Sequence, residues 1–227
     1  FAYLLGYRFC MPPMHSTDDI YPVTRIGRFG LMDYGAYNRH GLMPAPPNVW
    51  TRIQHDQLEP QNAINITEEM FNSYPDAFSI DINSGLETIY RLDISDSEYF
   101  LIENRNNWFR DNVNIDSVRY AIYDNADDYP DYVEVLFDSV DIEFDENGVV
   151  TSVSSYDLGL PASGLLIWHI DESVIRTAPD EYSINADRER KGIDLEEADG
   201  AQDIGYPNIH LFTDPTSGYF GDMWFDG

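Results

Sequence analysis

Acidic side chains are concentrated in one short segment near the C-terminal end of the sequence. Carboxylate oxygens spaced along a loop can surround Ca²⁺, which takes about six to eight oxygen ligands in proteins. Gly200 would permit the sharp turn that such a loop needs. The spacing is not that of an EF-hand, and a solvated acidic loop would give the same pattern. The candidate calcium ligands are Asp194, Glu196, Glu197, Asp199 and Asp203.

Nucleophilic catalysis finds little support in the sequence. His169 and Asp171 are two residues apart, so a strand would place them on one face, where a His–carboxylate pair can act as a general base. No serine lies in a nucleophile elbow of the Gly-x-Ser-x-Gly type. We therefore expect His169 to be an ordinary strand residue. Asn65 begins an Asn-Ile-Thr acceptor pattern for N-glycosylation, which matters only in an organism that glycosylates its proteins.

The charge of the chain is strongly negative. Among 227 residues, 41 are Asp or Glu and 13 are Lys or Arg, so the formal net charge is −28. Such a surface repels phosphate groups, so nucleic acids and anionic membranes are poor partners. No apolar run approaches the roughly 18 residues of a membrane span, so we expect no spanning segment. Adaptation to high salt and calcium loading both explain the acidity, and both indicate a location outside the cytosol. The single cysteine, Cys10, excludes an internal disulfide and is expected to be buried.

The elements that would position these residues are mainly strands. Residues 1–7 suit the last turn of a helix capped by Gly6, residues 8–48 are rich in loops, and Asn48 suits the N-cap of a short helix. From about residue 60 the period becomes strand-like, with β-branched and aromatic residues separated by turn residues. We expect strands at 61–66, 77–82, 86–93, 98–104, 117–123, 132–138, 140–145, 149–154 and 164–171.

Two local patterns refine the expected fold. Asn147-Gly148 predicts a tight hairpin between the strands on either side of it. Residues 164–170 are almost continuously apolar, which indicates a central strand buried on both faces. The sequence thus predicts a mainly β fold (α+β overall), with a loop-rich segment over residues 1–58 followed by an antiparallel β-rich domain over residues 59–227.

Several passages, taken together and in order, carry a further signal. They are GRFGLMDYG at 27–35, PPNVWTR at 46–52, EYFLIENR at 98–105, SGLLIWHID at 163–171, KGIDLEEADG at 191–200 and GDMWF at 221–225. These passages resemble the immune inhibitor A-type secreted zinc metallopeptidases, in the part that follows their zinc-binding helix. The resemblance implies that residues 1–58 are the C-terminal remnant of a metallopeptidase-like catalytic domain. It also implies that Met32 and Tyr34 belong to a Met-turn-like loop beneath the metal.

Zinc chemistry in that family requires residues that this chain does not show. The family's helix carries His-Glu-x-x-His, in which two imidazoles bind the metal and the Glu acts as general base. If Phe1 and Ala2 are the two spacer residues, Tyr3 occupies the position of the second His. A neutral phenol is a poor zinc ligand. His15 lies nearby, and we expect it to be a surface residue unless its loop folds differently.

Two functions are compatible with these observations. The first is a secreted, non-catalytic metallopeptidase-like module (a pseudoenzyme) that serves binding or assembly and is stabilised by calcium. The alternative is a fragment of an active secreted zinc endopeptidase, whose His-Glu pair lies upstream and whose zinc depends on that segment. The first residues read as a helix already under way, so we expect an excised piece of a longer protein. Its apolar Leu4 and Leu5 would be covered by the upstream segment or by other copies of the chain, and we expect self-association.

Overall fold

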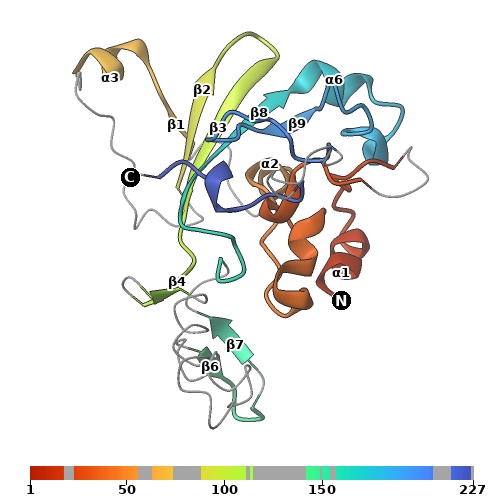
Figure 1. Ribbon diagram of the computed structural model, residues 1–227, viewed down its shortest axis with the longest axis vertical. Coiled ribbons are helices and arrows are strands. Elements are labelled where there is room, and N and C mark those ends of the chain that lie inside the picture. Colours follow the sequence, from red (N-terminus) through yellow and green to blue (C-terminus); the bar gives the residue numbers. More distant parts are fainter. Residues whose placement is uncertain are drawn as a thin grey trace.

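A five-stranded mixed sheet lies at the centre of the protein (Figure 1). The computed structural model describes residues 1–17, 23–55, 63–73, 88–110, 113–114, 142–148, 150–153, 157–206 and 216–225. The sheet order is β1-β2-β3-β8-β9, in which β1 and β2 are parallel and the other neighbours are antiparallel. Its strands are β1 (Ile64–Asn65), β2 (Ile89–Asp93), β3 (Glu98–Arg105), β8 (Gly164–Asp171) and β9 (Ile193–Leu195). The expectation of a β-rich, α+β fold is confirmed, but the sheet is not purely antiparallel as expected, because β1 pairs with β2 in parallel.

Two small two-stranded sheets accompany the large one. They consist of β4 (Trp108–Arg110) with β5 (Val113–Asn114), and of β6 (Ile142–Phe144) with β7 (Val150–Val153). The β6–β7 pair lies at one end of the longest axis (Figure 1) and confirms the predicted hairpin. Only Gly148 of the predicted turn pair has a positive φ, +78°, and its N–H donates to the Asp145 carbonyl at 3.0 Å. The predicted strands at 77–82, 117–123 and 132–138 lie outside the described residues.

The helices are short. They are α1 (Ala2–Arg8), η1 (Gly27–Phe29), η2 (Tyr34–Gly41, with non-helical backbone at 38–40), α2 (Val49–Gln54), α3 (Glu68–Ser73), α6 (Glu172–Thr177), η5 (Glu181–Ser183) and η6 (Phe220–Asp222). The Asn48 side chain accepts a hydrogen bond from the Thr51 backbone N–H at 2.9 Å, which confirms the predicted N-cap of α2. In the described part of the chain, no helix has the length and apolarity that a bilayer crossing requires.

The end of α1 differs from expectation. The helix continues through Gly6 to Arg8, and Cys10, with a φ of +59°, takes the left-handed conformation just beyond it. Cys10 is exposed, so the expectation of a buried thiol is wrong. Gly6 has a packing role instead of a capping role, because a Cβ at this position would lie 2.2 Å from the sulfur of Met32.

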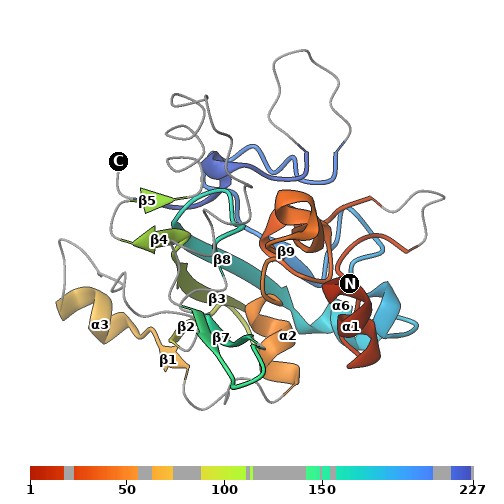
Figure 2. The same ribbon diagram turned by 90° about the horizontal axis from the view of Figure 1, so that it is seen from below.

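One hydrophobic core joins the sheet to the N-terminal segment. Helix α2 lies against β3 (Figure 2), and apolar residues from both sides of the predicted boundary at residue 58 belong to the same buried cluster. That cluster includes Met14, Ile26, Phe29, Met32, Val49, Trp50, Ile89, Leu101, Leu166, Trp168, Ile170, Ile193 and Met223. Whether the two segments fold as separate domains stays a prediction.

Strand β8 alternates in burial, although its sequence does not alternate in polarity. Leu166, Trp168 and Ile170 have no exposed surface, whereas Leu165 and Ile167 on the opposite face are half-buried. The expectation of a strand buried on both faces is therefore wrong. An apolar run predicts a strand here, but the elements that pack on the sheet decide which face is covered.

Candidate functional site

Two tyrosine side chains of α1 meet the imidazole of His15. The Tyr3 hydroxyl is hydrogen-bonded to His15 Nε2 and lies 2.9 Å from the Tyr7 hydroxyl, which is itself 3.5 Å from the same nitrogen. His15 Nδ1 donates to the Ser16 carbonyl at 2.8 Å, so in the neutral ring Nε2 is the acceptor and a tyrosine hydroxyl the donor. We call Tyr3, Tyr7 and His15 the Tyr–Tyr–His cluster. It brings Tyr3 into contact with His15, the histidine that lies nearest to it in the sequence.

The surroundings of Tyr3 in the Tyr–Tyr–His cluster keep its phenol neutral. Burial raises the pKa of the Tyr3 hydroxyl well above its usual range, and the hydrogen bond with Tyr7 raises this pKa further. A phenolate is the form of tyrosine that binds metals, and it is disfavoured here. His15 is half-buried against the two tyrosine rings, so it is not the surface residue that we expected.

Met32 packs against Gly6, in the C-terminal half of α1. Its side chain is 1% exposed, and its sulfur occupies the space that the absent side chain of Gly6 leaves. The Met32 carbonyl accepts a hydrogen bond from the Met14 N–H at 2.9 Å, which ties its loop to the segment before His15. Tyr34, the other residue of the predicted Met-turn-like loop, is 44% exposed, with its ring 5.7 Å from that of Tyr37. The structure thus packs Met32 against Gly6 of α1, while the ring of Tyr34 lies beside that of Tyr37.

A buried carboxylate organises the loop around Met32. Asp33 accepts hydrogen bonds from the backbone N–H groups of Arg25 and Ile26, both at 2.8 Å, and from the Thr24 hydroxyl at 2.9 Å. Burial raises the pKa of Asp33, while the three hydrogen bonds act in the opposite direction. Because Asp33 is 3% exposed and its bonds point into its own loop, we regard it as structural.

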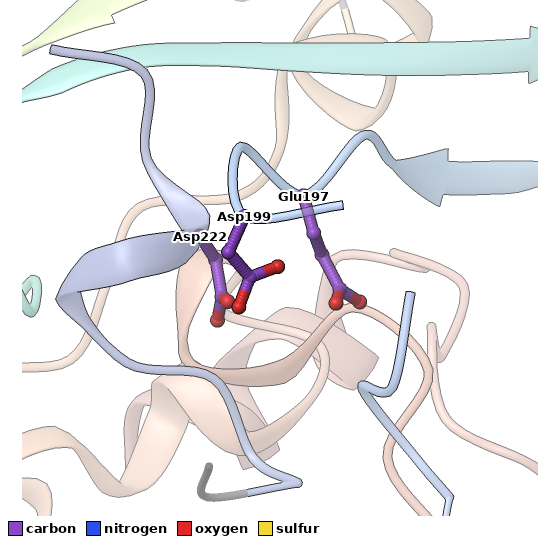
Figure 3. A group of neighbouring side chains, drawn as sticks. All are labelled: Glu197, Asp199 and Asp222. Atoms are coloured by element: carbon purple, nitrogen blue, oxygen red, sulfur yellow. The ribbon is translucent and has the colours of Figure 1, made fainter. Parts of the chain in front are cut away.

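A second candidate site lies where the loop after β9 meets η6. One carboxylate oxygen from each of Glu197, Asp199 and Asp222 lies within 4.8 Å of the others (Figure 3). Figure 3 shows the Asp199 and Asp222 carboxylates side by side, with that of Glu197 beside them and pointing the same way. The two segments are joined by a hydrogen bond from the Ala198 N–H to the Asp222 carbonyl at 3.1 Å. We call these three residues the acidic triad.

The structure divides the set of calcium ligands predicted from the sequence. Glu197 and Asp199 belong to the acidic triad, and the Asp203 backbone N–H donates to the Glu197 carboxylate at 2.8 Å. Asp194 and Glu196 are not part of the triad. Asp194 is paired instead with Lys191, at 2.5 Å. Alternation along β9 and the residues directly after it separates Asp194 and Glu196 from Glu197, since successive side chains point to opposite faces of a strand. Asp199 reaches the triad from the turn that follows.

Asp222 was not anticipated. It is 25 residues beyond Glu197 in the sequence, and only the fold brings the two together. Burial raises the pKa of the Asp222 carboxyl to about 7, and the charges of Glu197, Asp199 and Asp203 add to the shift despite a hydrogen bond from the Tyr219 N–H. In the sequence, Asp222 lies in the GDMWF passage, and nothing in that passage predicts a contact with the acidic loop.

The remaining predicted residues lie elsewhere. His169 Nε2 is 3.4 Å from the Glu98 carboxylate, across the β3–β8 pair. Asp171 caps α6, with its carboxylate accepting hydrogen bonds from the Ser173 N–H at 2.8 Å and the Val174 N–H at 3.1 Å. The two residues therefore have separate partners and do not form a catalytic pair. Asn65 is exposed on β1, as a glycosylation acceptor must be.

A buried ion-pair network that joins α2 to β3 was also not predicted from the sequence. Glu103 bonds Arg52 through one oxygen, and its other oxygen accepts from Arg105 at 3.1 Å and from the Trp168 indole at 2.9 Å. Arg105 Nε donates to Asp157 at 2.8 Å, and its Nη2 bonds the second Asp157 oxygen. All four charged side chains are buried. The two-residue spacing along β3 could have predicted the burial of these charges, because Glu103 and Arg105 share the inward face of β3 with Tyr99 and Leu101.

Comparisons with known proteins give no neighbour: no family model, no curated protein and no solved structure matches this chain.

Proposed function

We propose that this chain is a non-catalytic, metallopeptidase-like module that acts outside the cytosol in binding or assembly. The observation that carries the proposal is the Tyr–Tyr–His cluster. On the immune inhibitor A-like interpretation of the sequence, Tyr3 stands where the family has a zinc-binding imidazole, and Met32 belongs to the loop beneath the metal. The packing of Met32 against Gly6 and the hydrogen bond between Tyr3 and His15 support that interpretation.

The chemistry of the Tyr–Tyr–His cluster favours a structural role over a catalytic one. The Nε2 lone pair of His15 accepts a hydrogen bond, so it would have to exchange that partner for a metal ion. The neutral Tyr3 phenol offers a weak donor oxygen, which zinc does not favour beside nitrogen or sulfur ligands. One accessible imidazole does not make a tetrahedral zinc site.

A substitution tests whether Tyr3 holds a ligand position. Tyr3→His would place a second imidazole next to His15, and two imidazoles bind zinc or cobalt far better than one. We expect Tyr3→His to bind Co²⁺ at least about ten-fold more tightly than the wild type, with the visible absorption of a nitrogen-ligated site. Tyr37→His is the matched control, since Tyr37 is 59% exposed on the neighbouring η2 segment.

Metal analysis and proteolysis complete the test. The wild-type chain should carry no stoichiometric zinc and should leave casein uncut. Stoichiometric zinc with casein cleavage would overturn the proposal and favour the active zinc endopeptidase. Equal Co²⁺ affinity for Tyr3→His and Tyr37→His would show that Tyr3 does not occupy a ligand position.

The assembly part of the proposal rests on the surface formed by α1 and η2. Phe1, Leu4, Phe9, Tyr37 and Leu42 are each more than half exposed there. Residues 1–55 contain five arginines and three acidic residues, whereas the rest of the chain has eight basic and 38 acidic side chains. The weakly basic charge of this segment complements the acidic remainder of a second copy, and burial of the exposed apolar side chains would stabilise the contact. We therefore propose that copies associate through the α1–η2 surface.

Sedimentation velocity at micromolar concentration tests this association. Leu4→Glu should shift the chain toward monomer, because it adds a negative charge to an exposed apolar position. Ile94→Glu, at a position that is 51% exposed in the β2–β3 turn, makes the same chemical change away from the surface and should leave association unchanged. A wild-type chain that is monomeric throughout, or equal effects of the two variants, would contradict it.

A further inference from the structure

We propose that the acidic triad of Glu197, Asp199 and Asp222 binds one hard divalent cation, Ca²⁺, which joins η6 to the loop after β9. Calcium–oxygen distances of about 2.3–2.6 Å allow ligand oxygens on opposite sides of the ion to lie about 5 Å apart. The three carboxylate oxygens lie within 4.8 Å of one another, so all three can contact one calcium ion. None of these residues belongs to the Tyr–Tyr–His cluster, so the cation site is independent of the proposed function.

The strongest indication is an unsatisfied oxygen on Asp222. This side chain is 1% exposed, and its Oδ2 accepts a hydrogen bond from the Tyr219 N–H at 2.8 Å. Its Oδ1 is fully buried and has no hydrogen-bond partner among the described residues. A buried carboxylate oxygen without a partner is costly, and a cation among the triad would satisfy it.

The partners of the other two carboxylates leave room for a cation. Glu197 accepts from the backbone N–H groups of Asp203 at 2.8 Å and Ile204 at 3.0 Å, which fixes its carboxylate in place. Asp199 accepts from the Ala201 N–H at 2.8 Å and the Tyr219 hydroxyl at 3.1 Å. Each carboxylate oxygen can take a metal in addition to one hydrogen bond, because it has two lone pairs.

Charge balance also favours a cation. Within the described residues, neither Glu197, Asp199 nor Asp222 forms an ion pair with Lys or Arg. Three adjacent carboxylates without an ion-pair partner repel one another, and two of the three are buried. Calcium suits this set better than magnesium, which needs shorter bonds in near-ideal octahedral geometry. The exposed side of Asp199 leaves the remaining ligand positions to water.

Thermal melting and terbium luminescence of the full chain test the site. Addition of Ca²⁺ to the chelator-stripped protein, at about a hundred times its dissociation constant, should raise the melting midpoint by about 5–11 °C. Tb³⁺, which takes the same oxygen ligands as calcium, should luminesce on excitation of Tyr219, whose hydroxyl contacts Asp199. Excess Ca²⁺ should displace Tb³⁺ and abolish this luminescence.

Variants locate the site within the acidic segment. Asp222→Asn and Asp199→Asn should each weaken Ca²⁺ binding by about ten-fold or more, since loss of even an outer-shell partner costs that much. Glu196→Gln is the matched control, because it removes the same charge next to Glu197 but outside the triad, and it should change affinity by less than about two-fold. The exposed Asp199 makes its variant informative even if Asp222→Asn fails to fold.

Two results would overturn the proposal. One is the absence of any calcium-dependent shift in the wild-type midpoint, which would mean that the Asp222 carboxyl is simply protonated beside its neighbours. The other is an equal loss of affinity in Asp199→Asn and Glu196→Gln, which would mean that calcium binds diffusely to the acidic surface.

Discussion

Removal of the charge on Glu103 should destabilise the protein more than an ordinary substitution. In Glu103→Gln, the side chain keeps its size, but the network of Arg52, Glu103, Arg105 and Asp157 changes from neutral to a net charge of about +1. The new amide N–H₂ group must also face an arginine or the Trp168 indole, which are donors themselves. Glu103 has no exposed surface, so water cannot compensate either loss.

The magnitude follows from burial. Breaking a buried ion pair by removing one partner costs about 3–5 kcal/mol, because the remaining charge stays buried without compensation. In a chain of this size, about 1 kcal/mol shifts the melting midpoint by about 2–4 °C, so Glu103→Gln should melt about 6–20 °C below the wild type. Urea unfolding, followed by Trp fluorescence, measures the same loss as a lower midpoint with an unchanged slope.

An exposed ion pair provides the control. Arg91 and Asp93 lie 2.7 Å apart, but their side chains are 37% and 60% exposed. Asp93→Asn should therefore cost no more than about 1 kcal/mol. A loss below about 1 kcal/mol in Glu103→Gln, or a similar loss in both variants, would refute the view that burial makes this ion-pair network costly to break.

Three further predictions concern pH and packing. The positive charges of Arg105 and Arg52 outweigh the effect of burial and lower the pKa of Glu103. The stabilising contribution of Glu103 is therefore complete above its pKa in the unfolded chain and is lost as pH falls through its pKa in the folded chain. In acid titration, the unfolding free energy of Glu103→Gln should fall less steeply than that of the wild type. Gly6→Ala, which would normally stabilise a helix, should destabilise by about 1–3 kcal/mol in thermal melts because the new Cβ meets Met32, and a gain in stability would contradict this packing. Asp171→Ala should cost about 1 kcal/mol in urea unfolding through loss of the α6 cap, and an unchanged midpoint would show that the cap contributes nothing.

Local patterns in the sequence predicted local structure well. The Asn48 cap, the hairpin at Gly148 and strands β2, β3 and β8 follow from residue types within a few positions of one another. The short strand β9 was missed because its three residues lie within an acidic segment that reads as a loop. Hydrogen bonds to β8 form this strand, although its residue types do not predict one.

Contacts between distant segments could not be predicted in the same way. Asp222 lies near Glu197 because the C-terminal segment joins the sheet, through a bridge between Trp224 and Leu165 and a hydrogen bond from the Ala198 N–H to the Asp222 carbonyl. The distance between Tyr3 and His15 likewise depends on the loop that folds back under α1. The sequence identified acidic residues as candidate ligands, but the alternation after β9, the turn at Asp199 and the position of η6 decide which of them lie together.

Metal content of the full chain, purified without chelators and measured by mass spectrometry, tests both proposals at once. We predict about one calcium ion per chain, lost in Asp199→Asn but retained in Glu196→Gln, and only trace zinc. Stoichiometric zinc would contradict a non-catalytic Tyr–Tyr–His cluster. Calcium that is absent from the wild type, or retained in Asp199→Asn, would contradict the cation site at Glu197, Asp199 and Asp222.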